Sequence, residues 1–265
     1  MSQWRRTLLY CFTALVLAFL VLPVLTLVPA SFSPTSYIQL APAHYSLRWY
    51  EIFLQDRGWL SALTNSLLIA LMATPMAVVI GTMAAFAVER QSGWKRSLST
   101  ALFLAPMIVP FVITGLALYY AMRWSGLLGT LFSIAVGHAV IAMPFVMLNV
   151  GVALKSVNPS LAKAAAGLGA SPLRVLWTVV LPGIYPGLAS GALFSFIISF
   201  DEVVVSIFLA SFQNKPLPVR LFEAVRVDLS PTAAVAATVT LVLTLLVVPL
   251  IRMLESRQTR KGEKA

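Results

Sequence analysis

The chain has 265 residues, of which 59% are hydrophobic and 11% are charged, and its mean hydropathy is +0.90. Soluble domains carry about 25% charged residues, so this composition excludes a soluble protein and predicts a polytopic membrane protein. The net charge of +10 does not indicate nucleic-acid binding, because no basic groove with interleaved aromatic residues is evident. A single cysteine, Cys11, lies in an apolar run, which excludes a disulfide framework and a CxxC metal site.

Six apolar runs follow one another along the chain and predict six transmembrane helices. They cover about residues 7–30, 62–88, 98–122, 130–154, 183–210 and 232–251. A short basic start (1–6) precedes the first span, whose apolar run is too long for a typical signal-peptide h-region, so we expect it to be retained. A basic tail (252–265), expected to be disordered at its end, follows the last span. Residues 217–225 have amphipathic spacing and predict a short helix on the membrane surface. No internal repeat is evident, and six spans are few for a complete transporter, so the chain resembles half of one.

The Lys and Arg residues are distributed unevenly between the two sides of the membrane. If the N-terminus is internal, thirteen of the 19 fall inside, and the six outside are Arg48, Arg57, Arg123, Lys215, Arg220 and Arg226. By the positive-inside rule, both termini are therefore cytoplasmic. The loop at 156–182 is then cytoplasmic as well, and the charge of +10 is explained without nucleic acid.

The loop at 156–182 carries start and stop signals for two short helices. Asn158 suits an N-cap, and Pro159 suits the first helical position, where its missing N–H costs nothing. Gly169 is placed to end this first helix in a left-handed conformation. Ser171-Pro172 repeats the start signal, and the second helix runs to the end of the loop. The side chains of the first helix are small, so the loop predicts a surface that another protein can approach closely.

Glycines recur every four residues at the start of the fifth span, at Gly183, Gly187 and Gly191. This spacing places them on one helical face and permits close contact with another helix. The partner helix belongs either to the same subunit or to a second one, and the sequence leaves both alternatives open.

Two adjacent acids, Asp201 and Glu202, lie in the otherwise apolar end of the fifth span. An acidic side chain in a span is costly and by default marks a transport pathway or a buried partner. Adjacent residues on a helix point about 100° apart, so only one acid is expected to face a lumen. An acidic wall would favour a cationic substrate. The alternatives are hydration at the outer interface and an ion pair with Arg220 or Arg226.

No catalytic or nucleotide-binding motif is present in the sequence. Without G-x-x-x-x-G-K-[ST], the chain cannot hold nucleotide phosphates by that mechanism, and HExxH is also absent. The histidines, His44 and His138, are far apart, and His138 is interpreted as a hydrogen-bonded packing residue. No nucleophile–base pair is visible. We therefore expect a chain that is not an enzyme and has no metal or cofactor of its own.

The loop at 156–182 resembles the cytoplasmic "EAA" loop of permease subunits in binding-protein-dependent ABC importers. The family pattern is Glu-Ala-Ala, three residues, Gly, nine residues, Ile, one residue, Leu-Pro. Here Ala164-Ala165 matches the alanines, Gly169 the glycine and Leu181-Pro182 the end, while Val179 replaces the isoleucine. Lys163 stands where the family has glutamate, which puts in doubt any charge contact made at that position.

This resemblance implies the fold of a type I ABC importer permease, in which the loop lies in a cleft of an ATPase subunit. ATP-driven closure of the ATPases would move the loop as a lever and switch the pathway between inward- and outward-facing states. The implied partners are a dimer of ATPase subunits, a second homologous permease subunit, an extracytoplasmic substrate-binding protein and membrane lipid. The residues assigned to ATPase coupling are Lys163, Ala164, Ala165, Gly167, Gly169, Ala170, Ser171, Leu181 and Pro182.

The stretch Ser199-Phe-Asp-Glu-Val-Val-Val-Ser206, with Leu217-Pro218 and Ser230-Pro231, is similar to the spermidine/putrescine-type permeases. This similarity implies a bacterial inner-membrane protein that carries polyamines or a similar small cation. The residues assigned to its translocation pathway are Ser195, Ser199, Asp201 and Glu202. Two alternatives remain: the same mechanism with a phosphonate, Fe(III) or thiamine as cargo, and a half-size secondary transporter that needs no ATPase.

Overall fold

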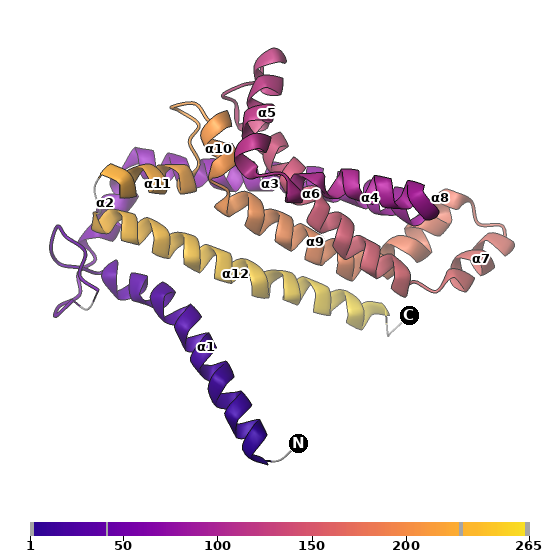
Figure 1. Ribbon diagram of the computed structural model, residues 1–265, viewed down its shortest axis with the longest axis horizontal. Helices are drawn as coiled ribbons and strands as arrows, with labels where there is room; N and C mark the ends of the chain where they lie inside the picture. The colour runs from indigo at the N-terminus through magenta and orange to yellow at the C-terminus, as the bar shows by residue number, and fades with distance from the viewer. Residues whose placement is uncertain (1–2, 41, 228–229, 263–265) are drawn as a thin grey trace. The chain divides into compact units, whose positions relative to one another are not determined.

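The computed structural model describes residues 3–40, 42–227 and 230–262, and within these ranges it contains helices and no strand (Figure 1). The all-α prediction is therefore confirmed for the described part of the chain. The helices are α1 (Gln3–Ala30), α2 (Arg48–Gln55), α3 (Arg57–Glu89), α4 (Gly93–Ile108), α5 (Phe111–Trp124), α6 (Leu131–Ser156), α7 (Pro159–Gly167), α8 (Pro172–Val175), α9 (Leu181–Asp201), α10 (Val204–Leu209), α11 (Leu217–Val227) and α12 (Pro231–Gly262).

The chain forms two compact units. One consists of the residues up to Leu60 together with Arg220–Leu243, and the other contains Ser61–Val219 and the chain from Thr244 onwards. Helices α3, α11 and α12 contribute residues to both units. All residues assigned above to coupling, helix packing or the pathway belong to the second unit.

In the first unit, hydrogen bonds tie the segment between α1 and α2 to aromatic residues of α2. The hydroxyl groups of Ser31 and Tyr50 are 2.7 Å apart, and the indole N–H of Trp49 donates to the carbonyl of Thr35 at 3.1 Å. The ring of Tyr50 also packs against Phe32, with 5.0 Å between the ring centroids. The segment that the sequence shows as polar and aromatic is thus a folded connection.

Also in the first unit, one carboxylate organises the start of α3. Oδ1 of Asp56 accepts the backbone N–H groups of Gly58 at 2.7 Å and Trp59 at 3.1 Å, which caps the helix. Arg220 lies 3.3 Å from the same oxygen, and its guanidinium is 4.8 Å from the centre of the Trp59 ring. Arg220, one of the possible partners for the acids of the fifth span, therefore pairs with Asp56.

The second unit is organised around α6, which packs along α9 and also contacts α4, α5 and α10 (Figure 1). Many of the buried side chains are alanines, which lets the helices approach closely. One buried cluster comprises Ala77, Ala84, Ala85, Ala139, Ala142, Val146, Met147, Val150 and Ile184. A second comprises Ile69, Ala73, Ile134, Ala135, Ile141, Val205 and Leu209.

Among the described residues, four helical stretches are long and apolar enough to cross a membrane: Gln3–Leu22, Arg57–Glu89, Leu131–Ser156 and Pro172–Asp201. The pair α4 and α5 would make a fifth, and Pro231–Leu246 is a shorter apolar helix. These segments correspond in order to the six predicted spans. The count of six and the cytoplasmic position of both termini stay predictions.

The third predicted span, 98–122, differs from the single helix that we expected. It is divided between α4 and α5, whose axes are bent by 99° at a break of a few residues. Val109, the residue between α4 and Pro110, is extended, with φ −70° and ψ 131°. A residue before proline is driven out of the α conformation by steric clash, so Pro110 explains the break.

The fifth predicted span, 183–210, also has different ends. It is continuous with the second helix of the preceding loop, because α8 leads through a π turn (Leu176–Val180) directly into α9. In a regular α-helix a proline clashes with the carbonyl four residues before it, and the wider turn directly before Pro182 lets the helix continue. At its other end, α9 stops at Asp201, and α10 is a separate short helix.

The remaining predictions concern the ends of the chain and the last loop. Helix α11 confirms the helix expected at 217–225, while its position on the membrane surface stays a prediction. Helix α12 extends to Gly262, well into the segment expected to be a tail. The disorder expected at the end of that tail falls on residues 263–265, which lie outside the described residues, as do residues 1–2 of the basic start.

Candidate functional site

The loop between α6 and α9 begins as the sequence predicts. The side chain of Asn158 accepts the N–H of Ser160 at 3.0 Å, and Pro159 occupies the first helical position of α7. The next helix is capped in the same manner, because Oγ of Ser171 accepts the N–H of Arg174 at 3.3 Å. Both capping predictions are confirmed.

Gly169 ends α7 with a φ of +86°, a conformation that residues with a side chain rarely adopt. The N–H of Gly169 donates to the carbonyl of Ala166 at 3.0 Å, and the N–H of Ala170 donates to the carbonyl of Ala165 at 3.1 Å. These two bonds form a Schellman motif, which satisfies the last carbonyls of α7. The predicted left-handed glycine is confirmed, and it sets the angle between the two arms of the loop.

The surface of the loop is exposed and contains more apolar area than its small side chains suggest. Four large apolar side chains are exposed on it: Leu161, Leu168, Leu173 and Trp177. Leu168 retains 90% of its accessible area and Trp177 retains 65%. Exposed apolar groups that cluster in this way are typical of a protein-docking surface. Sequence reasoning had stressed the alanines and missed these side chains, although their position in a loop between two spans was a usable signal.

The residues assigned to coupling divide between two places. Seven of them lie between the end of α6 and the start of α9, and of these Lys163, Ala164, Gly167, Gly169 and Ser171 are exposed, while Ala165 and Ala170 are half-buried. The other two, Leu181 and Pro182, form the first turn of α9, where Leu181 packs against the apolar core. The loop and the span therefore share one continuous helix from Pro172 to Asp201.

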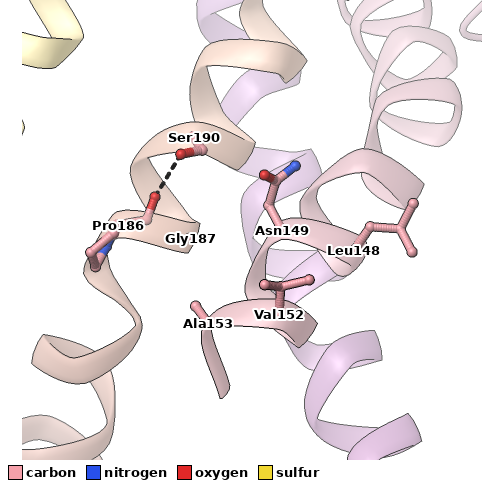
Figure 2. Close-up of a pocket in the computed structure, with 7 residues that line it drawn as sticks. All are labelled: Leu148, Asn149, Val152, Ala153, Pro186, Gly187 and Ser190. Carbon is pink, nitrogen blue, oxygen red and sulfur yellow. Dashed lines mark hydrogen bonds between the residues drawn. The ribbon is translucent and has the colours of Figure 1, made fainter. Parts of the chain in front are cut away.

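The three glycines of α9 lie against α6 and the residue that follows it, all in the same subunit. A β-carbon at Gly183 would come within 2.8 Å of Val157, and one at Gly191 would come within 3.1 Å of the α-carbon of Val146. At Gly187 the contact is closest, and Figure 2 shows it facing α6 beside Asn149 and Ala153. The sequence left open whether the glycine face packs within the subunit or against a second one, and in the structure it packs within the subunit.

A groove of about 390 Å³ lies beside this crossing, between α6 and α9 (Figure 2). Its lining residues are Leu148, Asn149, Val152, Ala153, Pro186, Gly187 and Ser190. The polar groups in it bond to their own helices, since the Asn149 amide donates to the Phe145 carbonyl and the Ser190 hydroxyl to the Pro186 carbonyl, both at 2.8 Å. The groove therefore offers mainly apolar contact.

A buried polar cluster lies at the end of α9 that is remote from the loop. His138 of α6 is 0% exposed, and its two ring nitrogens are 2.9 Å from Oγ of Ser199 and 2.8 Å from Oγ of Ser206. Oε2 of Glu202 lies 3.4 Å from the second nitrogen. The interpretation of His138 as a hydrogen-bonded packing residue is confirmed. Its partners were missed, because nothing in the sequence relates residues so far apart along the chain.

The two adjacent acids have different surroundings. Glu202 is 6% exposed, and its carboxylate accepts the N–H groups of Val205 and Ser206, each at 2.9 Å, at the start of α10. Asp201, in contrast, is exposed at the end of α9. A buried carboxylate must be hydrogen-bonded or paired, and Glu202 meets this requirement inside the subunit.

The other two residues assigned to the pathway, Ser195 and Ser199, are buried as well. The hydroxyl of Ser199 bonds to His138, whereas that of Ser195 has no hydrogen-bond partner among the described residues. The structure therefore brings Ser199 and Glu202 together in the cluster around His138, and Asp201 is the assigned residue that reaches the surface.

The arrangement of helices has the fold of a solved importer subunit. It matches the crystal structure of a bacterial ABC transporter involved in the import of the acidic polysaccharide alginate, with a TM-score of 0.73 and 20% sequence identity, covering 96% of this chain and 98% of that one. The family model described as "Binding-protein-dependent transport system inner membrane component" matches residues 77–260. The chain belongs to this family.

Relatives of known name are similar over nearly the whole chain. The putrescine transport system permease protein PotI of Escherichia coli (strain K12) is 34% identical, with 91% of this chain and 86% of the relative covered. The spermidine/putrescine transport system permease protein PotC of Haemophilus influenzae is 31% identical, with 95% and 96% covered. The chain is thus an inner-membrane permease subunit of an ABC importer, and ATP is hydrolysed by a separate subunit. The family recognised from the loop is confirmed.

Proposed function

We propose that the chain forms half of the translocation pathway of an ATP-driven importer for polyamines, together with a second, homologous permease subunit. The observation that carries this proposal is the similarity, over more than nine-tenths of the chain, to permeases named for putrescine and for spermidine/putrescine transport. Polyamines are cations at neutral pH, so their pathway requires groups that tolerate or attract positive charge.

Asp201 is the residue of this chain that we assign to the cation. It is exposed at the end of α9, whereas its neighbour Glu202 is buried and bonded to α10. This arrangement agrees with the expectation that only one of two adjacent acids faces a lumen. An ionised carboxylate in a region of low dielectric constant attracts an ammonium group more strongly than it does in water.

The exposed loop formed by α7, α8 and the π turn is the surface that we assign to the ATPase subunit, on the cytoplasmic side. Its two capped arms meet at a fixed angle at Gly169, and its exposed apolar side chains suit a protein cleft. The helix continues from the loop into α9 up to Asp201, so movement of the loop is transmitted along one element to the pathway. A substrate-binding protein delivers the cargo on the opposite side, and apolar side chains such as those exposed on α1 face lipid.

Uptake by the reconstituted importer tests this function. The chain is co-expressed with its partner permease, the ATPase and the binding protein, and the uptake of radiolabelled putrescine and spermidine is measured in membrane vesicles with ATP supplied and the proton gradient collapsed. We expect ATP-dependent uptake, reduced by excess unlabelled polyamine and unaffected by thiamine, Fe(III) or a phosphonate. Uptake that ignores ATP and disappears with the gradient would contradict the ABC mechanism, and competition by one of the other cargoes would replace the polyamine.

A further inference from the structure

The imidazole of His138 connects three elements of the second unit. It projects from α6, one nitrogen bonds to Ser199 in the last turns of α9, and the other bonds to Ser206 in α10. Helices α9 and α10 are separated by a break at Glu202 and Val203, so the ring bridges this break from the side.

The carboxylate of Glu202 stabilises the break between α9 and α10. The carboxylate of Glu202 accepts two N–H groups of α10, from Val205 and Ser206, and also lies 3.4 Å from the imidazole of His138. Helix N-termini stabilise negative charge, and hydrogen bonds to an ionised group are stronger than neutral ones. Both acceptor oxygens of Glu202 are thereby engaged, and α10 is fixed relative to α6 and to the end of α9.

The surrounding packing leaves little freedom for another arrangement. Next to His138, a β-carbon at Gly137 would come within 2.7 Å of Leu209 and 3.0 Å of Val205, so α6 and α10 are in close contact at this level. Ser199 is 3% exposed, and His138 is fully buried. These hydrogen bonds are therefore buried in the packed interior of the unit.

Asp201 lies between the two points that His138 holds. It follows Ser199 by two residues, directly precedes Glu202, and is the last residue of α9. The direction in which its exposed carboxylate points depends on where α9 ends and where the chain turns into α10. We propose that His138 is a positioning residue for the transported cation, which acts by fixing the direction of the Asp201 carboxylate. This inference rests on the proposed function, because it deepens the role assigned there to Asp201.

Labelling of position 201 tests the inference without any transport. The chain carries one cysteine, the exposed Cys11, so Cys11→Ser with Asp201→Cys leaves a single thiol at the site. In the assembled importer, we compare the rate of reaction with a trimethylammonium methanethiosulfonate reagent with and without His138→Phe. His138→Phe removes the hydrogen bonds to both Ser199 and Ser206, and we expect the labelling rate to change by about tenfold as a result. An unchanged rate would overturn the positioning role.

Two further variants separate positioning from simple stability. Val150→Ala makes a cavity in the buried part of α6, in the apolar cluster that contains no residue of α10, and it should lower the yield of the complex while leaving the labelling rate unchanged. His138→Gln keeps one donor and one acceptor and should restore most of the original rate. If His138→Phe does not assemble, Ser206→Ala takes its place; it removes only the bond to α10 and keeps the bond to Ser199, so the expected change is smaller, about threefold.

Uptake kinetics distinguish failure of this inference from failure of the proposed function. When Asp201 is unchanged, His138→Phe should raise the KM for putrescine, while the ATP-dependent maximal rate per assembled complex changes little. In an Asp201→Asn background, His138→Phe should have no further effect on KM, because the carboxylate that it positions is absent. If Asp201→Asn itself leaves KM unchanged, the pathway assignment fails; if it raises KM and His138→Phe does not, the positioning inference alone fails.

Discussion

Gly187 of α9 lies so close to Ala153 of α6 that a β-carbon at position 187 would be 2.6 Å from the β-carbon of Ala153. The carbonyl oxygen of Asn149 would be at 2.7 Å, and a backbone atom cannot move aside as a flexible side chain can. This crossing holds α9, the helix that we propose transmits movement of the loop, against α6. The stability of the subunit therefore depends on the absence of a side chain at this position.

Gly187→Ala should destabilise the subunit by about 1–3 kcal/mol, the usual cost of overpacking. The matched control is Gly151→Ala in α6, where an added β-carbon meets nothing within 4 Å and the better helix propensity of alanine contributes about 1 kcal/mol. Thermal unfolding of both variants in detergent, followed by fluorescence, measures the difference. Equal midpoints for the two variants would contradict the close crossing.

Gly169→Pro should leave membrane insertion intact but abolish ATPase co-purification and transport. Proline holds φ near −65°, whereas position 169 has +86°, and proline also lacks the N–H that bonds to Ala166. The two arms of the loop would then meet at a different angle. Gly151→Ala is the control, since Gly151 lies in α6, outside the loop, with open space around it, and the variant should retain co-purification. Normal ATPase binding by Gly169→Pro would remove the coupling role from the loop.

Neutralisation of Asp201 and of Glu202 should have different effects, the first on uptake and the second on stability. Asp201 is exposed, so the Asp201→Asn variant should assemble normally. The importer that contains it should take up putrescine less well, with an increased KM. Glu202→Gln loses a charged acceptor for Val205 and Ser206 and should reduce stability by about 1–3 kcal/mol, measured by thermal unfolding. Asp201→Glu is the conservative control for the charge. The assignment is wrong if Asp201→Asn reduces assembly while Glu202→Gln affects only uptake.

Local signals in the sequence predicted the parts of the structure that local chemistry determines. The caps at Asn158 and Ser171 and the left-handed Gly169 depend on neighbouring backbone groups, and all three are confirmed. The break at Pro110 has a local cause as well, but the apolar run extends across it, and hydropathy alone does not register a bend. The surroundings of His138 could not be predicted, because they arise only when α6, α9 and α10 pack together.

In the first unit, the charge of Asp56 should matter less than its ability to cap α3. Asp56→Asn keeps an acceptor for the N–H groups of Gly58 and Trp59, and it loses only a partly exposed pair with Arg220, so we expect a loss below about 1 kcal/mol. Asp56→Ala removes the cap as well and should cost about 1–2 kcal/mol. The two unfolding midpoints are compared at the same salt concentration. A charge-dominated site would instead show equal losses in both variants.

Lys163 replaces a family glutamate, and its surroundings indicate the sign of the charge that it meets. It is exposed on α7, and the stretch 156–182 contains Lys163 and Arg174 but no acidic residue, so the surface that we propose docks the ATPase is basic. We therefore expect the cleft of the ATPase partner to be acidic where it faces α7. Lys163→Glu should then weaken ATPase co-purification at low salt.

Lys163→Ala serves as the control for loss of charge without reversal, and its effect should be the smaller of the two. Because exposed charges are screened by salt, the difference between the variants should decrease as ionic strength rises from about 0.01 to 1 M. Co-purification is measured on the assembled importer across this range. Tighter ATPase binding by Lys163→Glu would contradict the acidic cleft. It would mean that the partner has a basic group opposite position 163 and that Lys163 weakens the contact.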